Sequence, residues 1–331
     1  MKTQVLPIDP LDPSVEAVNQ AAELIRKGEL VAFPTETVYG LGANALDANA
    51  VKKIYEAKGR PQTNPIIVHV SGKEQAQSLV TTWTEDAEKL AEAFWPGPLT
   101  IVLPKNDRVP SITTAGSPTV ALRCPDDETA LMLIETSGFP IAAPSANTSG
   151  NLSPVDGFHV LQDLEGKIPM LLDSGQVPGG IESTVIDLSG PKPKLLRPGL
   201  LQLSEIEQVI GPVERGPSYV DSSSPAHSPG LLKRHYAPHT PLIEGNADDV
   251  DEMLKRGKPV GMLNYKVKKI DHPNLTAIAL PGNPKEYAYH LYRALRELDE
   301  MGVDTIFFEM PPERDEWLGI RDRLTRASAN D

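Results

Sequence analysis

Residues 14–42 have the sequence SVEAVNQAAELIRKGELVAFPTETVYGLG, which indicates the fold class. The first half has the spacing of an amphipathic helix that Gly28 can end, with apolar side chains at Val15, Val18, Ala22 and Ile25. The second half predicts a strand over residues 30–33 that leads into a loop of hydroxyl groups and glycines, residues 33–42. Because ligands of α/β proteins lie at strand ends, this loop is a candidate binding element in an α/β fold.

The remainder of residues 1–211 mixes helices and strands. The spacing of apolar residues predicts helices at 49–58, with Asn49 as the N-cap, near 85–94 and near 129–137. Short runs rich in apolar and β-branched residues predict strands at 66–70, 99–103 and 120–123. These elements do not follow a strict strand–helix–strand order, and we expect the strands to belong to one sheet.

A second, smaller unit follows a segment without periodicity. Residues 212–240 are rich in glycine, proline and serine, which predicts a linker. Beyond it, the pattern predicts a small open α/β domain over residues 241–331, with strands at 260–263, 277–280 and 305–308 and a helix at 284–301. A chain of 331 residues has the length of two domains, so we expect residues 1–211 to form the other one.

Composition argues against several classes of protein. The 32 Lys and Arg residues against 45 Asp and Glu residues give a net charge of −13, which argues against a general nucleic-acid binder. The single cysteine, Cys124, can form neither an intrachain disulfide nor a thiolate metal cage. The sequence shows no apolar run long enough for a membrane span and no secretory signal, so we expect a soluble, cytoplasmic protein.

Polar residues that suit a binding site cluster in four regions: residues 33–42, 58–65, 140–150, and 182–184 together with 196–199. Lys58, Arg60 and Arg197 supply cations that suit phosphate or carboxylate groups. Each region also has an ordinary structural interpretation, as a tight turn, a solvated helix end or a surface salt bridge. His69 lies inside an apolar run, where a histidine is more often a core residue than a ligand.

The sequence lacks the patterns of several other catalytic sites. It has no GxSxG elbow and no HExxH motif, and residues 33–42 match neither GxGxxG nor a Walker loop. Separated cations and neutral donors without an evident nucleophile suit phosphoryl or adenylyl transfer. That chemistry depends mainly on positioning and charge stabilisation, and the nucleotide brings Mg²⁺ with it. We therefore expect no permanent protein-bound metal.

Seven ordered motifs resemble those of the Sua5/YciO/YrdC family. They are FPTETVYGLG, KGRPQTNPIIVHV, FWPGPLTIVL, VALRCP, PIAAPSANTSG, IESTVIDL and LLRPG. Residues 228–238, SPGLLKRHYAP, are similar to the segment that joins this domain to a C-terminal domain in the two-domain, Sua5-type members. The resemblance covers most of the chain. It implies a twisted, curved mixed α/β sheet of YrdC-like type, with a cationic concave face, and a smaller Rossmann-like C-terminal domain.

The resemblance also implies an activity. Members of the family are nucleotidyltransferases that form threonylcarbamoyl-adenylate and pyrophosphate from L-threonine, bicarbonate or CO₂, and ATP. The adenylate is the donor for N6-threonylcarbamoyladenosine at position 37 of tRNA. We therefore expect Mg²⁺ to arrive with ATP, the product to pass to a tRNA threonylcarbamoyl-transferase, and neither stable direct tRNA binding nor membrane association.

The family's site residues map onto this sequence motif by motif. Lys58 and Arg60 are the expected catalytic residues. Threonine is expected to contact Thr37, His69, Arg123, Ala143 and Ser183. ATP is expected to contact Arg60, Asn64, Thr119, Ser145, Asn147, Ser153, Arg197 and Tyr236, with Tyr236 closing over it as a lid.

Two alternatives and one departure from the family pattern stay open. The same residues could form a module that binds double-stranded RNA or tRNA without chemistry, or could support carbamoyl-adenylate chemistry on another amine or on carbamoyl phosphate. After residues 312–314, the family's glycine-rich turn and Ala-Ile-Met-Asn-Arg-like helix are replaced by DEWLGIRDRL at 315–324, so the role of this helix is open.

Overall fold

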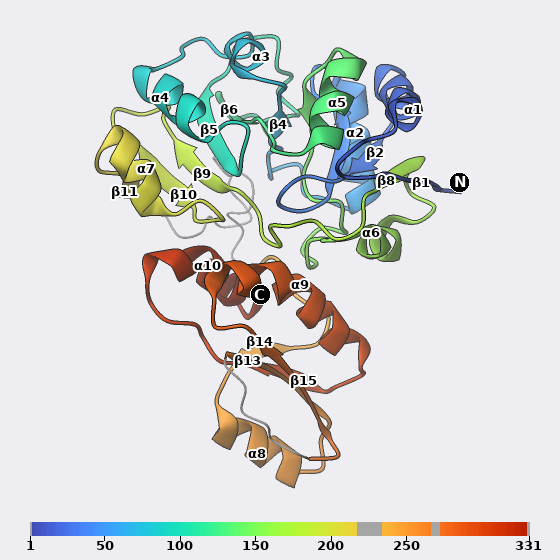
Figure 1. Ribbon diagram of the computed structural model, residues 1–331, viewed down its shortest axis with the longest axis vertical. Coiled ribbons are helices and arrows are strands. Elements are labelled where there is room, and N and C mark those ends of the chain that lie inside the picture. The colour runs from blue at the N-terminus through green and yellow to red at the C-terminus, as the bar shows by residue number, and fades with distance from the viewer. Residues whose placement is uncertain (1, 217–233, 266–271, 330–331) are drawn as a thin grey trace.

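The computed structural model describes residues 2–216, 234–265 and 272–329. These residues form two sheets, one in a larger part and one in a smaller part of the molecule (Figure 1). Residues 217–233 of the predicted linker, and therefore most of the SPGLLKRHYAP motif, lie outside the described residues. Residues 214–215 of that linker form a short strand instead, and the strand belongs to the large sheet.

The large sheet mixes parallel and antiparallel strand pairs, as the resemblance implied. Its described strands are, in spatial order, β1 (Gln4–Pro7), β8 (Met170–Asp173), β2 (Val31–Phe33), β3 (Gly40–Asn44), β7 (Ile141–Ala142), β4 (Val68–His69), β6 (Thr119–Arg123), β5 (Leu99–Pro104), β9 (Thr184–Asp187), β10 (Lys194–Arg197) and β11 (Glu214–Arg215). Helices of this part are α1 (Val15–Arg26), α2 (Ala48–Lys58), α3 (Lys73–Gln77), α4 (Glu85–Phe94), α5 (Glu128–Ser137), α6 (Gly157–Leu164) and α7 (Leu203–Ile210). The mixed α/β fold class is therefore confirmed.

The smaller part has a four-stranded parallel sheet in its described residues, in the order β12-β15-β13-β14. Its elements are β12 (Leu242–Glu244), α8 (Ala247–Lys255), β13 (Val260–Tyr265), β14 (Leu275–Leu280), α9 (Pro284–Glu300), β15 (Thr305–Phe308), a 3₁₀ turn (Asp315–Trp317) and α10 (Leu318–Ala327). The Rossmann-like assignment of this part and the domain boundaries stay predictions. Helices α9 and α10 face the larger part, and α8 lies at the far end (Figure 1).

The two parts meet at a close contact. Arg296 of α9 pairs with Asp163 of α6 at 2.9 Å. Gly180, with a φ of +81°, lies so near α9 that a Cβ there would be 2.1 Å from the carbonyl oxygen of Ala288. Any side chain at Gly180 would therefore force the two parts to shift.

Two local predictions were wrong. Asp47, and not Asn49, caps α2, because its carboxylate accepts hydrogen bonds from the backbone N–H groups of Asn49 and Ala50. The loop predicted at residues 33–42 is loop only in part, since its last residues begin strand β3, which pairs with β2. Gly42 permits this pairing, because a Cβ there would lie 2.7 Å from the Phe33 ring.

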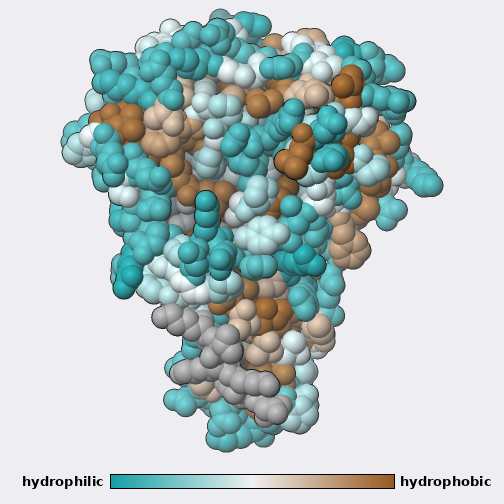
Figure 2. Space-filling model, viewed as in Figure 1, coloured by the Kyte–Doolittle hydropathy of each residue, from teal (hydrophilic) through white to brown (hydrophobic). Residues whose placement is uncertain are grey.

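The surface is mainly hydrophilic, and the helices turn their apolar faces inward. Hydrophilic residues predominate on the face shown in Figure 2, with smaller groups of hydrophobic residues between them. Helix α1 illustrates the arrangement: Ser14 caps it, and its buried face packs beside α5 against the sheet. Among the described residues, no helix combines the length and the apolar character needed to cross a membrane.

Candidate active site

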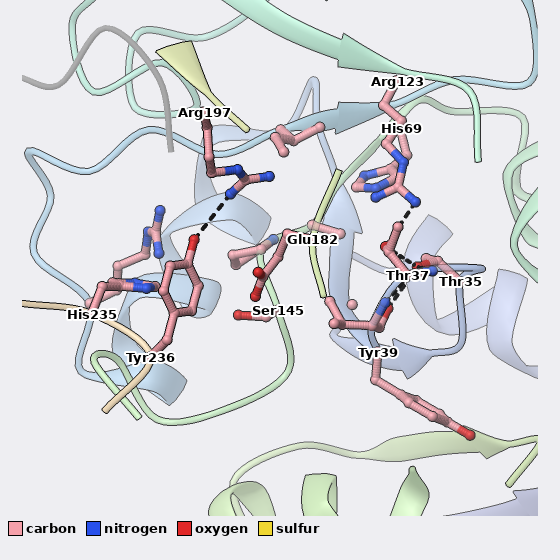
Figure 3. Close-up of a pocket in the computed structure, with 16 residues that line it drawn as sticks. Thr35, Thr37, Tyr39, His69, Arg123, Ser145, Glu182, Arg197, His235 and Tyr236 are labelled. Atoms are coloured by element: carbon pink, nitrogen blue, oxygen red, sulfur yellow. Dashed lines mark hydrogen bonds between the residues drawn. The ribbon is translucent and has the colours of Figure 1, made fainter. Parts of the chain in front are cut away.

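A cavity that encloses about 520 Å³, open solvent included, lies where the ends of several strands of the large sheet meet the start of the smaller part. Its lining comes from loops and strand ends that are far apart in the sequence (Figure 3). The lining residues are Thr35, Thr37, Val38, Tyr39, Gly40, Arg60, Ile67, His69, Arg123, Ala143, Pro144, Ser145, Glu182, Arg197, His235 and Tyr236.

One side of the cavity is built around Arg123. Strands β4 and β6 are parallel, and their register places His69 beside Arg123. The Arg123 guanidinium donates a 2.8 Å hydrogen bond to the Thr37 hydroxyl, as Figure 3 shows, and forms a 2.7 Å ion pair with Glu36. The side chain of Arg123 is only 4% exposed. A carboxylate placed here would meet a buried fork of N–H donors.

His69 is neutral in this environment. Burial, with a smaller effect from the charge of Arg123, lowers its pKa to about 3. Its Nδ1 atom has no hydrogen-bond partner among the described residues. An unpartnered nitrogen on a buried, cavity-lining ring is available to a ligand.

The opposite side of the cavity holds Arg197, His235 and Tyr236 (Figure 3). Arg197 donates hydrogen bonds to the carbonyl oxygen of Ser183 at 3.0 and 3.2 Å and to the Tyr236 hydroxyl at 3.3 Å. The His235 ring stands edge-on to Tyr236, with 4.1 Å between the ring centroids, and burial lowers the pKa of His235 to about 3. Arg197 is therefore the fixed cation of this side.

Arg60 extends the cationic surface of the cavity. Helix α2 ends at Lys58, and its C-cap Gly59, with a φ of +61°, turns the chain into the loop that begins with Arg60. Arg60 donates to the carbonyl oxygens of Asn64 at 3.0 Å and Pro65 at 2.6 Å. Burial lowers its pKa to about 10, which leaves it charged at neutral pH.

Lys58 is close to the cavity but does not line it. Its ammonium group donates to the carbonyl oxygens of Ser145, at 2.6 Å, and Asn147. Burial lowers the pKa of Lys58 well below its usual value, and the charge of Arg60 lowers it further. In this structure Lys58 anchors the loop that follows β7.

Eight of the residues expected at the site line the cavity: Thr37, Arg60, His69, Arg123, Ala143, Ser145, Arg197 and Tyr236. The others are not among the lining residues. The Asn147 amide accepts from the Ser145 hydroxyl, Ser153 donates to Glu182, and Ser183 shares a 2.8 Å hydrogen bond with Thr100. Thr119 bonds with Ser117 at the start of β6, and the buried Asn64 amide has no partner in the described part of the chain.

Sequence reasoning missed four lining residues with polar side chains: Thr35, Tyr39, Glu182 and His235. Each lies inside a motif that the sequence analysis identified, but none of them was expected to line the site. Glu182 is the acidic member of the cavity wall, and burial alone would raise its pKa. The charges of Arg323 and Arg197 instead lower the pKa of Glu182 to about 2.

Residues 2–216, 234–265 and 272–329 contain no group of three or more potential metal-ligating side chains.

We expect the buried histidines to make the free energy of unfolding fall as the pH is lowered. The unfolded chain protonates His69 below about pH 6.5, whereas the folded chain does not until about pH 3, so stability is lost as the pH falls between these values. Urea unfolding measures the free energy of unfolding at each pH. Between pH 7 and pH 5 this free energy should fall by about 2 kcal/mol more in the unmodified protein than in His69→Gln. Burial raises the pKa of Asp127 to about 7, so this carboxyl stabilises the folded state as the pH falls. Because both proteins contain Asp127, its effect cancels in the comparison. Equal losses would contradict the prediction.

Comparisons with known proteins extend over nearly the whole chain. A family model described as "Telomere recombination" matches residues 23–199, and one described as "Threonylcarbamoyl-AMP synthase, C-terminal domain" matches residues 201–329. A threonylcarbamoyl-AMP synthase of Pyrococcus abyssi is 49% identical, with 93% of each chain covered. One of Bacillus subtilis is 43% identical, with 97% of this chain and 95% of that protein covered. The crystal structure of P. abyssi Sua5 complexed with L-threonine has a TM-score of 0.91 and 46% identity, with 98% of each chain covered.

Proposed function

This chain belongs to the Sua5/YciO/YrdC family in its two-domain, Sua5-type form, and from this premise we propose that it is a threonylcarbamoyl-AMP synthase. It joins L-threonine, bicarbonate or CO₂, and ATP into threonylcarbamoyl-adenylate, with release of pyrophosphate. The enzyme is a transferase of the tRNA-modification pathway that leads to N6-threonylcarbamoyladenosine. Curated relatives of this name match the chain over almost its full length, which supports the assignment.

One observation in the structure supports the assignment most: a single cavity has two separate cationic ends. Arg123 lies at one end, with Thr37 and His69, and Arg197 lies at the other, with Tyr236 (Figure 3). The first end offers a fork for a carboxylate and neutral groups for an amine and a hydroxyl. The second offers a buried cation and an aromatic ring, which suit a nucleotide. We propose that the amino acid binds at the first end and ATP at the second.

In the proposed reaction the threonine amine first gives a carbamate, either with CO₂ and loss of a proton or with bicarbonate and loss of water. A carbamate oxygen then attacks the α-phosphorus of ATP, the bond to the bridging oxygen breaks, and pyrophosphate leaves. Negative charge builds up on the phosphate oxygens during this step. We propose that Arg60 and Arg197, which hydrogen-bond to backbone carbonyl groups, offset that charge.

The expected contacts divide between the two ends of the cavity. We propose that threonine contacts Thr37, His69, Arg123, Ala143 and Ser183, and that ATP contacts Arg60, Asn64, Thr119, Ser145, Asn147, Ser153, Arg197 and Tyr236. Lys58 acts by holding the loop of Ser145 and Asn147. ATP brings Mg²⁺, whose chemistry at the phosphates is charge neutralisation.

The further context follows from the same proposal. Residues 1–211 form the catalytic domain, residues 212–240 the connecting segment and residues 241–331 the C-terminal domain. The enzyme works in the cytoplasm and passes its adenylate to a tRNA threonylcarbamoyl-transferase. Its net charge of −13 supports a role without stable tRNA binding of its own.

Mass spectrometry of the product tests this function directly. Incubation of the full chain with ATP, isotopically labelled bicarbonate and L-threonine should yield a species that contains AMP, threonine and the label. Other amino acids substituted for threonine should give little pyrophosphate. Release of pyrophosphate that does not depend on threonine would support carbamoyl-adenylate chemistry on another acceptor. Absence of any adenylate, with a salt-dependent RNA gel shift, would support an RNA-binding module instead.

A further inference from the structure

Glu182 is an unusual neighbour for a nucleotide. Among the described residues that line the cavity it is the one acidic side chain, and it lies between the two cationic ends (Figure 3). The residue is 6% exposed. ATP is itself strongly anionic, so an uncompensated carboxylate in this wall would repel it across a medium of low dielectric constant. The partners of Glu182 therefore bear on how the site accepts ATP.

Two of these partners come from the smaller part of the molecule. Arg323 of α10 donates to a Glu182 carboxylate oxygen at 2.6 Å, and the hydroxyl of Tyr292 in α9 donates to the same oxygen at 3.1 Å. Ser153, from the larger part, donates to the other oxygen. Arg323 is 1% exposed, so its charge is confined to this buried cluster. The carboxylate is thus neutralised from across the boundary between the two parts.

The same two residues also contact Tyr236. The Arg323 guanidinium lies 5.0 Å from the centre of the Tyr236 ring, a cation–π distance. The Tyr292 ring stacks against Tyr236 with 6.1 Å between centroids and 25° between planes. Tyr236 in turn accepts a hydrogen bond from Arg197. A displaced Arg323 would therefore disturb both Glu182 and the aromatic ring at the Arg197 end.

The other charged residue that bonds Arg323 does not prevent Arg323 from neutralising Glu182. Asp322 accepts hydrogen bonds from Arg323 and also from Arg326, so Asp322 has a second cation of its own. Arg323 further donates to the carbonyl oxygen of Pro198 at 2.9 Å, next to Arg197. Its position is therefore fixed from several directions.

We infer that Arg323 and Tyr292 are positioning residues for ATP: they neutralise Glu182 and hold Tyr236 at the nucleotide end of the cavity. The inference rests on the proposed function, since it assigns that end to ATP. The helices of the smaller part thereby become part of the nucleotide site, although neither residue lines the cavity. Threonine, at the Arg123 end, does not depend on them.

Calorimetric titration of the full chain with Mg-ATP tests the inference without a need for turnover. Arg323→Met should weaken ATP binding about tenfold or more, because the buried carboxylate loses the cation that bonds it directly and keeps only the more distant charge of Arg197. The double variant Arg323→Met with Glu182→Gln should recover much of the loss, because the repelling charge is gone. Steady-state assays should show a raised KM for ATP and an unchanged KM for threonine. A purely structural role would produce neither the rescue nor this difference between substrates.

A milder pair of variants covers the case in which Arg323→Met does not fold. Tyr292→Phe removes only the hydroxyl that bonds Glu182, and should weaken ATP binding about threefold. Tyr287→Phe is the matched control on the same helix, because the buried Tyr287 hydroxyl has no hydrogen-bond partner in the described chain. Equal ATP affinity in both tyrosine variants, or equal losses for ATP and threonine in any variant, would overturn the inference. Failure of the proposed function would show separately, as a missing adenylate product in the unmodified protein.

Discussion

Arg60→Ala is expected to lower the rate of pyrophosphate release from ATP, threonine and bicarbonate by about 10²–10³-fold. Arg60 lines the cavity, and two backbone carbonyl groups fix its guanidinium before any substrate arrives. A cation that is already in place stabilises charge that develops on the phosphates without a cost of reorganisation. The loss should fall mainly on kcat, because the charge in question is greatest in the transition state.

The comparison variants for this experiment lie on the preceding helix. Lys58→Ala should also reduce turnover strongly, because it releases the carbonyl oxygens of Ser145 and Asn147. Lys52→Ala removes an exposed cation that pairs with Glu56 within α2, and should leave the rate unchanged. Near-normal activity in both Lys58→Ala and Arg60→Ala would contradict the roles proposed for them.

Arg123→Lys is expected to raise the KM for threonine about 10- to 100-fold while leaving the KM for ATP close to normal. The substitution keeps a positive charge beside Glu36 but removes the planar fork that can hold a carboxylate with two parallel hydrogen bonds. Steady-state kinetics with each substrate varied in turn provides the measurement.

Stability must be followed in the same variant, because Arg123 also pairs with a buried acid and bonds Thr37. Thermal unfolding of Arg123→Lys should show a folded protein. Arg108→Lys makes a conservative change at an exposed site and serves as the control for both measurements. An unchanged KM for threonine in a folded Arg123→Lys protein would show that the amino acid binds elsewhere.

The sequence predicted about half of the described elements, those with the clearest local patterns. Helices α1, α4 and α9 begin and end within a residue or two of the predicted bounds, since apolar spacing and capping residues lie within the elements themselves. Strand β3 was missed because its first three residues are Gly40-Leu41-Gly42, which read as loop. A side chain at either glycine would crowd the Phe33 ring. This contact exists only because β2 pairs with β3, which the local sequence does not show.

The sequence predicted the site residues that lie in recognisable motifs, but not the contacts between distant parts of the chain. Residues such as His69 and Arg123 were singled out from their motifs, and strand register then places them side by side. Glu182 and Arg323 lie 141 positions apart in two different parts of the molecule, and no periodicity relates them. The helix whose role was open from its sequence, at residues 318–327, proves to supply the cation of this pair. Contacts between parts depend on tertiary packing that local patterns do not encode.

The ion pair between Glu182 and Arg323 also sets an order of events during synthesis of the chain. A ribosome delivers the whole larger part, with the acid already in the wall of its cavity, long before it reaches residue 323. Until Arg323 emerges, Glu182 has Ser153 and the charge of Arg197 beside it but lacks the cation of α10. On the inference above, we expect a nascent chain that lacks α10 to bind ATP more weakly than the complete chain.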